Sequence, residues 1–366
     1  MQKLEFIFIL LLLTILGSFG ILCLCSPKTL YSKEEGRTLA IKSSFNMASE
    51  KSIDNLEKYY EDHFLFRNSL LEQGINIKRK LGINIQDGVY IGKDEYLLEE
   101  AKEVQKGNEF IKIMNEFYKK YNDKNMSLIL IPSHVTVNPS KAPANIFLFD
   151  EYHQMKTIYH QLTFNTIDVV PTLQEGLNDY PMYYRLDSHL TSYGSYYVYK
   201  EYARLNDIEQ VPITEFDIKE ISNNFSGNLV KKAYTFSFKK DTIVEFIPKN
   251  NVELEVQYQE RKENTLYNKN ATNDKMYEYF LGKDEPIIEI TNMSINNKQE
   301  ILILKDESAN AIIPFFTNHY YKVHVIDINY YDKSVSGYLD THKEIKDVVF
   351  IYKMNGLDDN IKNFSS

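Results

Sequence analysis

An apolar run near the N terminus constrains the chain more than any other feature of its sequence. Residues 6–24 contain no charged side chain. About 19 residues rising 1.5 Å each form a helix roughly 28 Å long, close to the thickness of the hydrocarbon core of a bilayer. The run also lacks the polar stripe at period 3.6 that a core helix of a soluble protein carries. It therefore predicts a transmembrane anchor over residues 1–25.

A cleaved signal peptide is the main alternative to an anchor. The apolar core of a signal peptide is normally shorter, and residues 22–27 lack small residues at the spacing that cleavage requires. A lipid-modified cysteine is disfavoured because a leucine precedes both Cys23 and Cys25. Lysines lie on both sides of the run, so basic residues alone do not decide its orientation. We expect a single-pass protein of the cell membrane with the bulk of the chain extracytoplasmic.

The remainder of the chain has the composition of an ordinary globular protein. Residues 26–50 are polar and without period, which indicates a linker, and residues 51–366 are enough for one large domain. Both cysteines lie at the membrane end, so this domain has neither a disulfide framework nor a cysteine-based zinc site. The net charge of −9 argues against nucleic-acid binding. We also expect no cofactor.

Short apolar runs alternate with helical segments over most of this domain. Buried strands are expected over residues 127–131, 166–170, 300–304, 322–326 and 347–352. Helices are expected over residues 106–121, 150–162, 192–205 and 308–319, and a hairpin over residues 89–98. Such alternation is typical of an α/β fold whose mainly parallel sheet is covered by helices on both faces. Residues from about 211 to 290 break this rhythm and predict a β-rich insertion.

One candidate for chemistry is the pair Asp187 and His189. Two positions apart in an extended segment, these side chains share a face. A carboxylate beside an imidazole fixes its tautomer and stabilises its charged form, as a general base for a hydroxyl nucleophile requires. A surface ion pair or a helix-entry turn explains the same pattern.

A second candidate is the junction at residues 304–310, where a buried strand stops and a helix is expected to begin. Such a junction places side chains and free N–H groups at the carboxyl edge of a sheet, where α/β proteins build their sites. A nucleophile elbow occupies the same kind of position. Asp306, Glu307 and Ser308 are equally favoured at a helix start for capping and dipole reasons.

These two segments resemble motifs of the DHHW family, which is related to alginate O-acetylation proteins of the SGNH-hydrolase-like type. In that family an Asp-x-His-Trp-Thr-Ser segment precedes a late Lys-Asp-Ser-Tyr/Phe-Ala-Asn segment that carries the serine. Here residues 187–192 read Asp-Ser-His-Leu-Thr-Ser, and residues 305–310 read Lys-Asp-Glu-Ser-Ala-Asn. Further family-like segments follow in order at residues 60–67, 88–94, 130–133, 225–229 and 325–327.

The resemblance implies an SGNH-hydrolase-like domain that O-acetylates a cell-surface polysaccharide together with a multi-pass membrane acyltransferase. In active relatives a serine accepts the acetyl group, a histidine acts as base and then as acid, and an aspartate orients the histidine. If this chain is active, we expect Ser308, His189 and Asp187 to take these roles. Backbone N–H groups of the turn, with Asn310, would stabilise the oxyanion.

Two departures from the family pattern bear on activity. Read without a gap, the family's serine falls on Glu307, Ser308 takes the place of its aromatic neighbour, and its tryptophan is Leu190. A shift of one position at a helix start rotates a side chain by about 100°. Glutamate is also a far poorer nucleophile than an activated serine, and its charge would pair with His189 instead.

Two further functions therefore stay open. One is a non-catalytic member that binds glycan or serves as a scaffolding subunit of a polysaccharide O-acetylation system. The other is a metal-dependent hydrolase using Asp187, His189 and Glu307, whose residue types suit a metal although no tight ligand spacing supports one. The position of Glu307 and of the Ser308 hydroxyl relative to His189 distinguishes an active serine from a lost one.

Overall fold

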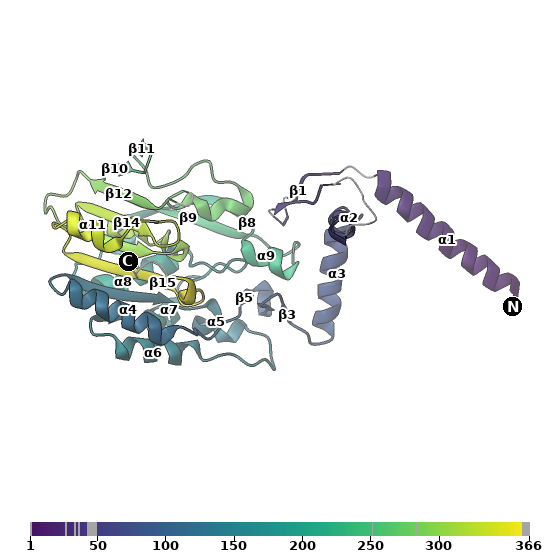
Figure 1. Ribbon diagram of the computed structural model, residues 1–366, viewed down its shortest axis with the longest axis horizontal. Coiled ribbons are helices and arrows are strands. Elements are labelled where there is room, and N and C mark those ends of the chain that lie inside the picture. Colours follow the sequence, from purple (N-terminus) through teal and green to yellow (C-terminus); the bar gives the residue numbers. More distant parts are fainter. Residues whose placement is uncertain are drawn as a thin grey trace. The chain divides into compact units, whose positions relative to one another are not determined.

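The computed structural model describes residues 2–25, 28–32, 34–35, 37–41, 50–250, 252–282 and 285–360. The chain divides into two compact units (Figure 1). One unit comprises Met1–Ile83 with Tyr234–Ser237, and the other comprises Asn84–Ala233 with Phe238–Ser366.

The first unit is helical. It contains α1 (Gln2–Cys25), α2 (Glu50–Asp62), α3 (Arg67–Lys80) and a short antiparallel pair, β1 (Tyr31–Ser32) with β2 (Arg37–Thr38). Within α1, the stretch Glu5–Cys23 has a mean hydropathy of 2.7 and is not buried, so the helix is long and apolar enough to cross a membrane. A signal sequence shares this length and composition.

Two ion pairs hold the segment around β2 against the helices of the first unit. The Arg37 guanidinium donates to Asp62 at the end of α2, and Asp62 also accepts the Ala40 N–H at 2.8 Å. Arg67 at the start of α3 pairs with Glu35. Asp62 and Arg67 both belong to the family-like segment at residues 60–67, and both hold the segment around β2 in place.

The second unit is built on an eight-stranded sheet with the order β11-β10-β12-β14-β13-β15-β6-β7. Its strands are β6 (Asn125–Ile131), β7 (Asn165–Ile167), β10 (Leu254–Gln257), β11 (Lys262–Glu263), β12 (Ile287–Asn292), β13 (Glu300–Lys305), β14 (Lys322–Asp327) and β15 (Asp347–Lys353). The pairs from β14 through β13, β15 and β6 to β7 are parallel. The pairs β12–β14, β10–β12 and β10–β11 are antiparallel, so the sheet as a whole is mixed.

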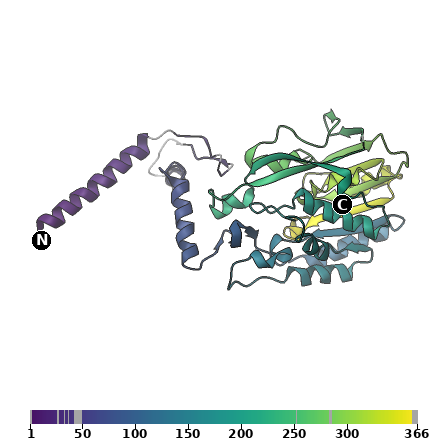
Figure 2. The same ribbon diagram turned by 180° about the vertical axis from the view of Figure 1, so that it is seen from behind.

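Alternate residues of the strands face two separate cores, as the period of two requires. On one face, Ile301 and Ile303 pack with aromatic side chains of α8 (Ser192–Leu205) and α10 (Ile313–Phe316). On the other face, Leu302 and Leu304 pack with α4 (Gly107–Lys120), α6 (Glu151–Gln161) and α11 (Val335–Thr341). The expected α/β class, with helices flanking a large sheet, is confirmed (Figures 1 and 2).

Two expected elements differ from those observed. The helix expected over residues 308–319 is instead a 3-10 turn, Glu307–Ala309, followed by the short α10, because Pro314 cannot supply the N–H that a continuous helix would need. The strand expected over residues 166–170 ends at Ile167, because α7 (Val170–Gly176) begins within the expected range, at Val170, with a proline in its first turn.

Smaller sheets complete the second unit. The expected hairpin is an antiparallel sheet of β3 (Ile85–Gln86), β4 (Val89–Ile91) and β5 (Leu97–Glu99). Within residues 211–290, β8 (Phe216–Phe225) pairs with β9 (Asp241–Pro248) in a sheet of their own. The strands β10, β11 and β12 of the same region extend the large sheet.

Candidate active site

The Asp187 and His189 side chains form a buried pair on the loop that precedes α8. The imidazole Nδ1 lies 2.5 Å from Asp187 Oδ1, and the same oxygen accepts the His189 backbone N–H at 3.0 Å. An isolated bridge between Tyr183 and Leu190 closes this loop and turns both side chains inward. The surface ion pair considered above is excluded because neither side chain is exposed.

Residues of the family-like segment 225–229 hold the other oxygen of Asp187. The Asn228 N–H donates to Asp187 Oδ2 at 2.8 Å. A Cβ atom on Gly227 would lie 2.2 Å from the Asp187 Cβ, so only glycine permits this approach. Thus Gly227 and Asn228, about forty positions away in sequence, orient the carboxylate that in turn orients His189.

A tyrosine links His189 to the turn after β13. The ring of Tyr277, within the 3-10 segment Asn273–Tyr279, stacks on the imidazole with centroids 3.8 Å apart. Its hydroxyl donates to the backbone carbonyl of Ser308 at 3.3 Å. The structure therefore brings Asp187, His189 and the turn at residues 306–308 into one neighbourhood.

Asp306 fixes the conformation of this turn through four hydrogen bonds. Its Oδ1 accepts the Ser308 N–H at 3.0 Å and the Ser308 hydroxyl at 2.5 Å. Its Oδ2 accepts the Lys353 N–H at 2.8 Å and the Asn360 amide at 3.2 Å. The Ser308 hydroxyl is thus buried and directed at Asp306, and no hydrogen bond joins it to His189.

The Glu307 side chain is exposed. Within the described ranges, no hydrogen bond or ion pair joins Glu307 to His189, whose Nδ1 is bound by Asp187. The expected ion pair of Glu307 with the imidazole is therefore not formed, and the carboxylate acts on His189 through its charge alone. The metal-dependent alternative loses its third ligand for the same reason.

Burial and charge act in opposite directions on the pair. Burial alone would lower the pKa of His189, but the charge and hydrogen bond of Asp187, with the charge of Glu307, outweigh it and raise that pKa. Burial would raise the pKa of Asp187, yet the imidazolium and the hydrogen bonds from His189 and Asn228 lower it. The pair therefore favours an imidazolium–carboxylate state, the state that a general base reaches after taking a proton.

The other candidate residues have distinct surroundings. Asn310 is buried, and its Oδ1 has no hydrogen-bond partner among the described residues. The N–H groups of Ser308, Ala309 and Asn310 donate within the turn, so they are not free for an oxyanion. Leu190, at the position of the family's tryptophan, packs in the core beneath α8.

Sequence patterns did not indicate several residues that build the site. Tyr277 lies in the expected insertion and has no local motif. At the carboxyl edge of the sheet, Lys305 forms a buried ion pair with Asp327 at the end of β14. After β6, the buried Glu151 carboxylate accepts the Ser133 hydroxyl at 2.7 Å and the Thr136 hydroxyl at 2.6 Å. The family-like segments at residues 130–133, 305–310 and 325–327 pointed to Ser133, Lys305 and Asp327, whereas no sequence pattern pointed to Tyr277 or Glu151.

Comparison with known proteins supports the same kinship. A crystal structure of a DHHW family protein from Eubacterium siraeum superposes with a TM-score of 0.67 at 19% identity, covering 76% of this chain and 96% of that one. Bacillus cereus PatB1, solved with a sulfonyl adduct, superposes with a TM-score of 0.63 at 19% identity, covering 75% of this chain and 98% of that one. At such identities these structures bear on the fold alone. No curated protein sequence matches the chain.

The sequence itself carries the family assignment. The family model described as "DHHW protein" matches residues 73–326, which is more than half of the chain. The matched range contains Asp187, His189, Gly227, Tyr277 and residues 305–310. The chain therefore belongs to the DHHW protein family.

Proposed function

We propose that this protein transfers or hydrolyses acetyl esters on a polysaccharide outside the cell, on an SGNH-hydrolase-like domain held at the membrane by α1. The buried Asp187–His189 pair beside the turn that carries Ser308 is the observation that supports this most. Taking two ionisable groups out of water is costly, so a buried, hydrogen-bonded acid–imidazole pair calls for a chemical reason. The hydrogen bond at Nδ1 leaves Nε2 as the nitrogen for a reacting hydroxyl.

In this proposal, Ser308 is the nucleophile and its hydroxyl turns from Asp306 to His189. The Ser308 Oγ attacks the acetyl carbonyl carbon while its proton passes to His189 Nε2. The ester C–O bond then breaks, and His189 returns the proton to the leaving oxygen. A sugar hydroxyl or water, deprotonated by His189, then attacks the acetyl-serine carbonyl. The bond from the acetyl carbon to Ser308 Oγ breaks, His189 returns the proton to Oγ, and an acetylated sugar or acetate leaves. The Asn310 side chain is the candidate donor to the oxyanion, because the N–H groups of the turn are engaged.

The partners in this proposal follow from the family resemblance. A multi-pass membrane acyltransferase would supply the acyl group, and the cell-surface polysaccharide would receive it. An anchored, extracytoplasmic domain suits both, because it meets the membrane enzyme on one side and the glycan on the other.

Hydrolysis of an activated acetyl ester by the full chain in detergent tests the proposal. We expect wild-type protein to release acetate, and Ser308→Ala and His189→Ala to lower the rate by about a thousandfold or more, because both take part in the reacting unit. Ser69→Ala, on the exposed face of α3, is the matched control and should leave the rate unchanged. Equal rates for wild type and Ser308→Ala would contradict the proposal.

A second function, a non-catalytic glycan-binding or scaffolding subunit, is favoured by one specific observation. The Ser308 hydroxyl donates to Asp306 and not to His189, while the exposed Glu307 occupies the family's serine position. Under this reading wild-type protein is inactive, and Glu307→Ser gains hydrolysis because it restores the family's nucleophile. Under the first reading Glu307→Ser adds little. The two variants, Ser308→Ala and Glu307→Ser, therefore give opposite results for the two functions.

A further inference from the structure

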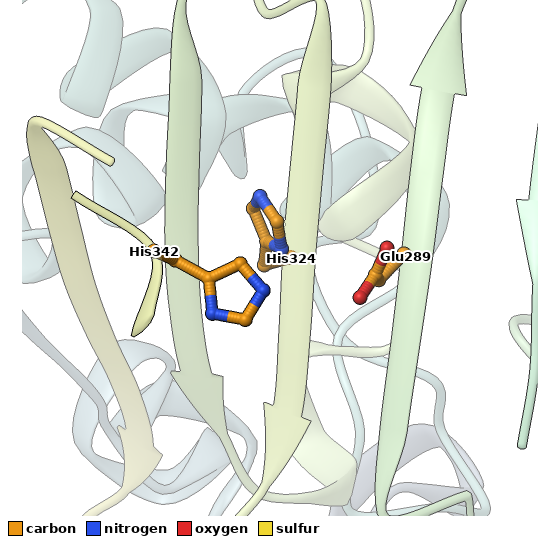
Figure 3. A group of neighbouring side chains, drawn as sticks. All are labelled: Glu289, His324 and His342. Atoms are coloured by element: carbon orange, nitrogen blue, oxygen red, sulfur yellow. The ribbon is translucent and has the colours of Figure 1, made fainter. Parts of the chain in front are cut away.

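A second cluster of polar side chains lies away from the candidate active site, on the face of the sheet covered by α11. Glu289 on β12 and His324 on β14 are direct partners across the antiparallel pair. His342 follows the C-terminal end of α11. One ligand atom from each of the three residues lies within 4.8 Å of the others. Figure 3 shows the three side chains pointing toward one another from separate elements.

The hydrogen bonds of both histidines leave one ring nitrogen of each facing the cluster. The Nε2 of His324 lies 2.8 Å from the Glu300 carboxylate, to which it donates in the neutral ring, so its Nδ1 carries the lone pair. The Nδ1 of His342 lies 2.9 Å from the Tyr338 carbonyl and donates to it, so its Nε2 carries the lone pair. Metal-binding histidines are held in this way, by a carboxylate or a backbone carbonyl on the nitrogen that does not bind the metal.

Burial and charge around the cluster also suit a cation. The His324 side chain is fully buried, and its Nδ1 lies 2.7 Å from the Tyr338 hydroxyl while its Nε2 lies 2.8 Å from Glu300. Glu289 is paired with Lys322 at 2.6 Å, and the Glu300 carboxylate lies beside the ring of His324. Two carboxylates, Glu289 and Glu300, therefore lie at the cluster beside one lysine, and a divalent cation would offset their charge.

We propose that Glu289, His324 and His342 bind Zn²⁺, which ties β12 and β14 to the end of α11. Two imidazoles and one carboxylate are ligands that zinc prefers, and it holds nitrogen and oxygen at about 2.0–2.2 Å. The Tyr338 hydroxyl lies 2.7 Å from His324 Nδ1 and 3.3 Å from Glu289 Oε1. The Tyr338 hydroxyl therefore lies where the fourth ligand of the zinc ion would be. The phenol oxygen or a water takes this position when zinc binds and the ligand atoms move closer to one another.

The site is independent of the proposed acyl chemistry. His324 lies three positions before Asp327, which ends β14 at the carboxyl edge, and its side chain faces the core that α11 covers. Its ligands come from three separated segments, which explains why no ligand spacing was visible in the sequence. The predicted role is structural cross-linking of the sheet to α11.

Zinc binding by the full chain in detergent tests this inference. The protein is stripped with a chelator, and Zn²⁺ alone is titrated in competition with a chromophoric chelator. We expect one Zn²⁺ per chain and a higher unfolding temperature when it binds. His342→Ala removes a partly exposed ligand with little effect on the fold, and it should weaken binding by about tenfold or more, while Glu300→Gln should weaken it by about 10- to 100-fold.

Two controls separate this cluster from other histidines. His160→Ala, on the exposed face of α6, should bind Zn²⁺ like the wild type. His189→Ala should also retain the ion, because that histidine lies at the candidate active site. Co²⁺ in place of Zn²⁺ should give the visible absorption of a four-coordinate site in wild type and lose it in His342→Ala. Absence of stoichiometric binding, binding that His342→Ala leaves intact, or binding that His189→Ala abolishes would each overturn the inference.

Discussion

His189 is subject to four influences that differ in sign. Burial and the charge of Lys353 lower its pKa, whereas Asp187 and Glu307 raise it, and the raising contributions prevail. A histidine accepts a proton as a base only while it is neutral, so base catalysis here begins above this raised pKa. Glu307 thus affects the pKa of His189 through its charge, although no hydrogen bond or ion pair joins it to the ring in the part of the chain that the structure describes.

This balance predicts opposite effects for two substitutions. Glu307→Gln removes a negative charge, so the pKa of His189 should fall and any esterase activity should begin at lower pH. Lys353→Gln removes a positive charge, so the same pKa should rise and the activity should begin at higher pH. NMR titration of the His189 imidazole in the full chain measures both shifts without requiring activity. A His189 pKa that is unaffected by Glu307→Gln would show that the charge does not reach the ring.

Gly227 provides a second prediction at the scale of one residue. In Gly227→Ala the new Cβ would meet Asp187 atoms at 2.2–2.3 Å, so the carboxylate must move from its hydrogen bonds with Asn228 and His189. We expect a loss of about 1–3 kcal/mol in the free energy of unfolding, typical of overpacking, together with a lower His189 pKa. Urea unfolding and NMR titration measure the two effects.

Gly74 in α3 is the matched control for Gly227. A Cβ at Gly74 meets nothing within 4 Å. Gly74→Ala should therefore stabilise the chain by about 0.5–1 kcal/mol through helix propensity, and it should leave His189 unchanged. A similar small effect of both substitutions would contradict the close packing of Gly227 on Asp187.

At the scale of elements, the ends of the parallel strands are joined by polar contacts. Lys305 and Asp327 are register partners at the last positions of β13 and β14, and their side chains form a buried ion pair. Asp306, which follows Lys305 in the chain, accepts the backbone N–H of Lys353 at the end of β15. These contacts fix the strand ends from which the turn at residues 306–308 projects, so the position of Ser308 depends on them.

The Lys305–Asp327 pair gives a prediction at this scale. Lys305→Met leaves the Asp327 carboxylate buried without a partner, which should lower the free energy of unfolding by about 3–5 kcal/mol. Replacing both residues, Lys305→Met with Asp327→Leu, should recover most of this loss because no unpaired charge remains. Urea unfolding of the single and double variants measures the difference. A double variant as unstable as the single one would mean that packing, and not the unpaired charge, sets the cost.

At the scale of the whole molecule, the sequence predicted the features that depend on neighbouring residues, and it did not predict contacts between residues far apart in the chain. The run 300–304 alternates between two apolar faces and became β13. Asp187 and His189 do meet, but on a series of bends and not on an extended segment, because Asp187 Oδ1 accepts the His189 N–H as well as contacting the imidazole. The contacts of Tyr277 and Gly227 depend on chain folding over long separations, so no window of sequence contains them. Pro314 shows that a proline decides where helices begin even inside a stretch that otherwise has a helical pattern.

The final prediction concerns where the molecule resides. The α1 stretch Glu5–Cys23 is apolar on all sides, so as an anchor it should keep the full chain in the membrane fraction through washes with high salt and alkali. A chain truncated to begin at Ser43 should stay in the aqueous fraction without detergent. Because a cleaved signal sequence would also release the protein, the N terminus must be read by mass spectrometry. An intact N terminus in the membrane fraction supports the anchor. A new N terminus beyond Cys25 in the aqueous fraction refutes the anchor. The candidate active site would then be free to reach glycans away from the membrane.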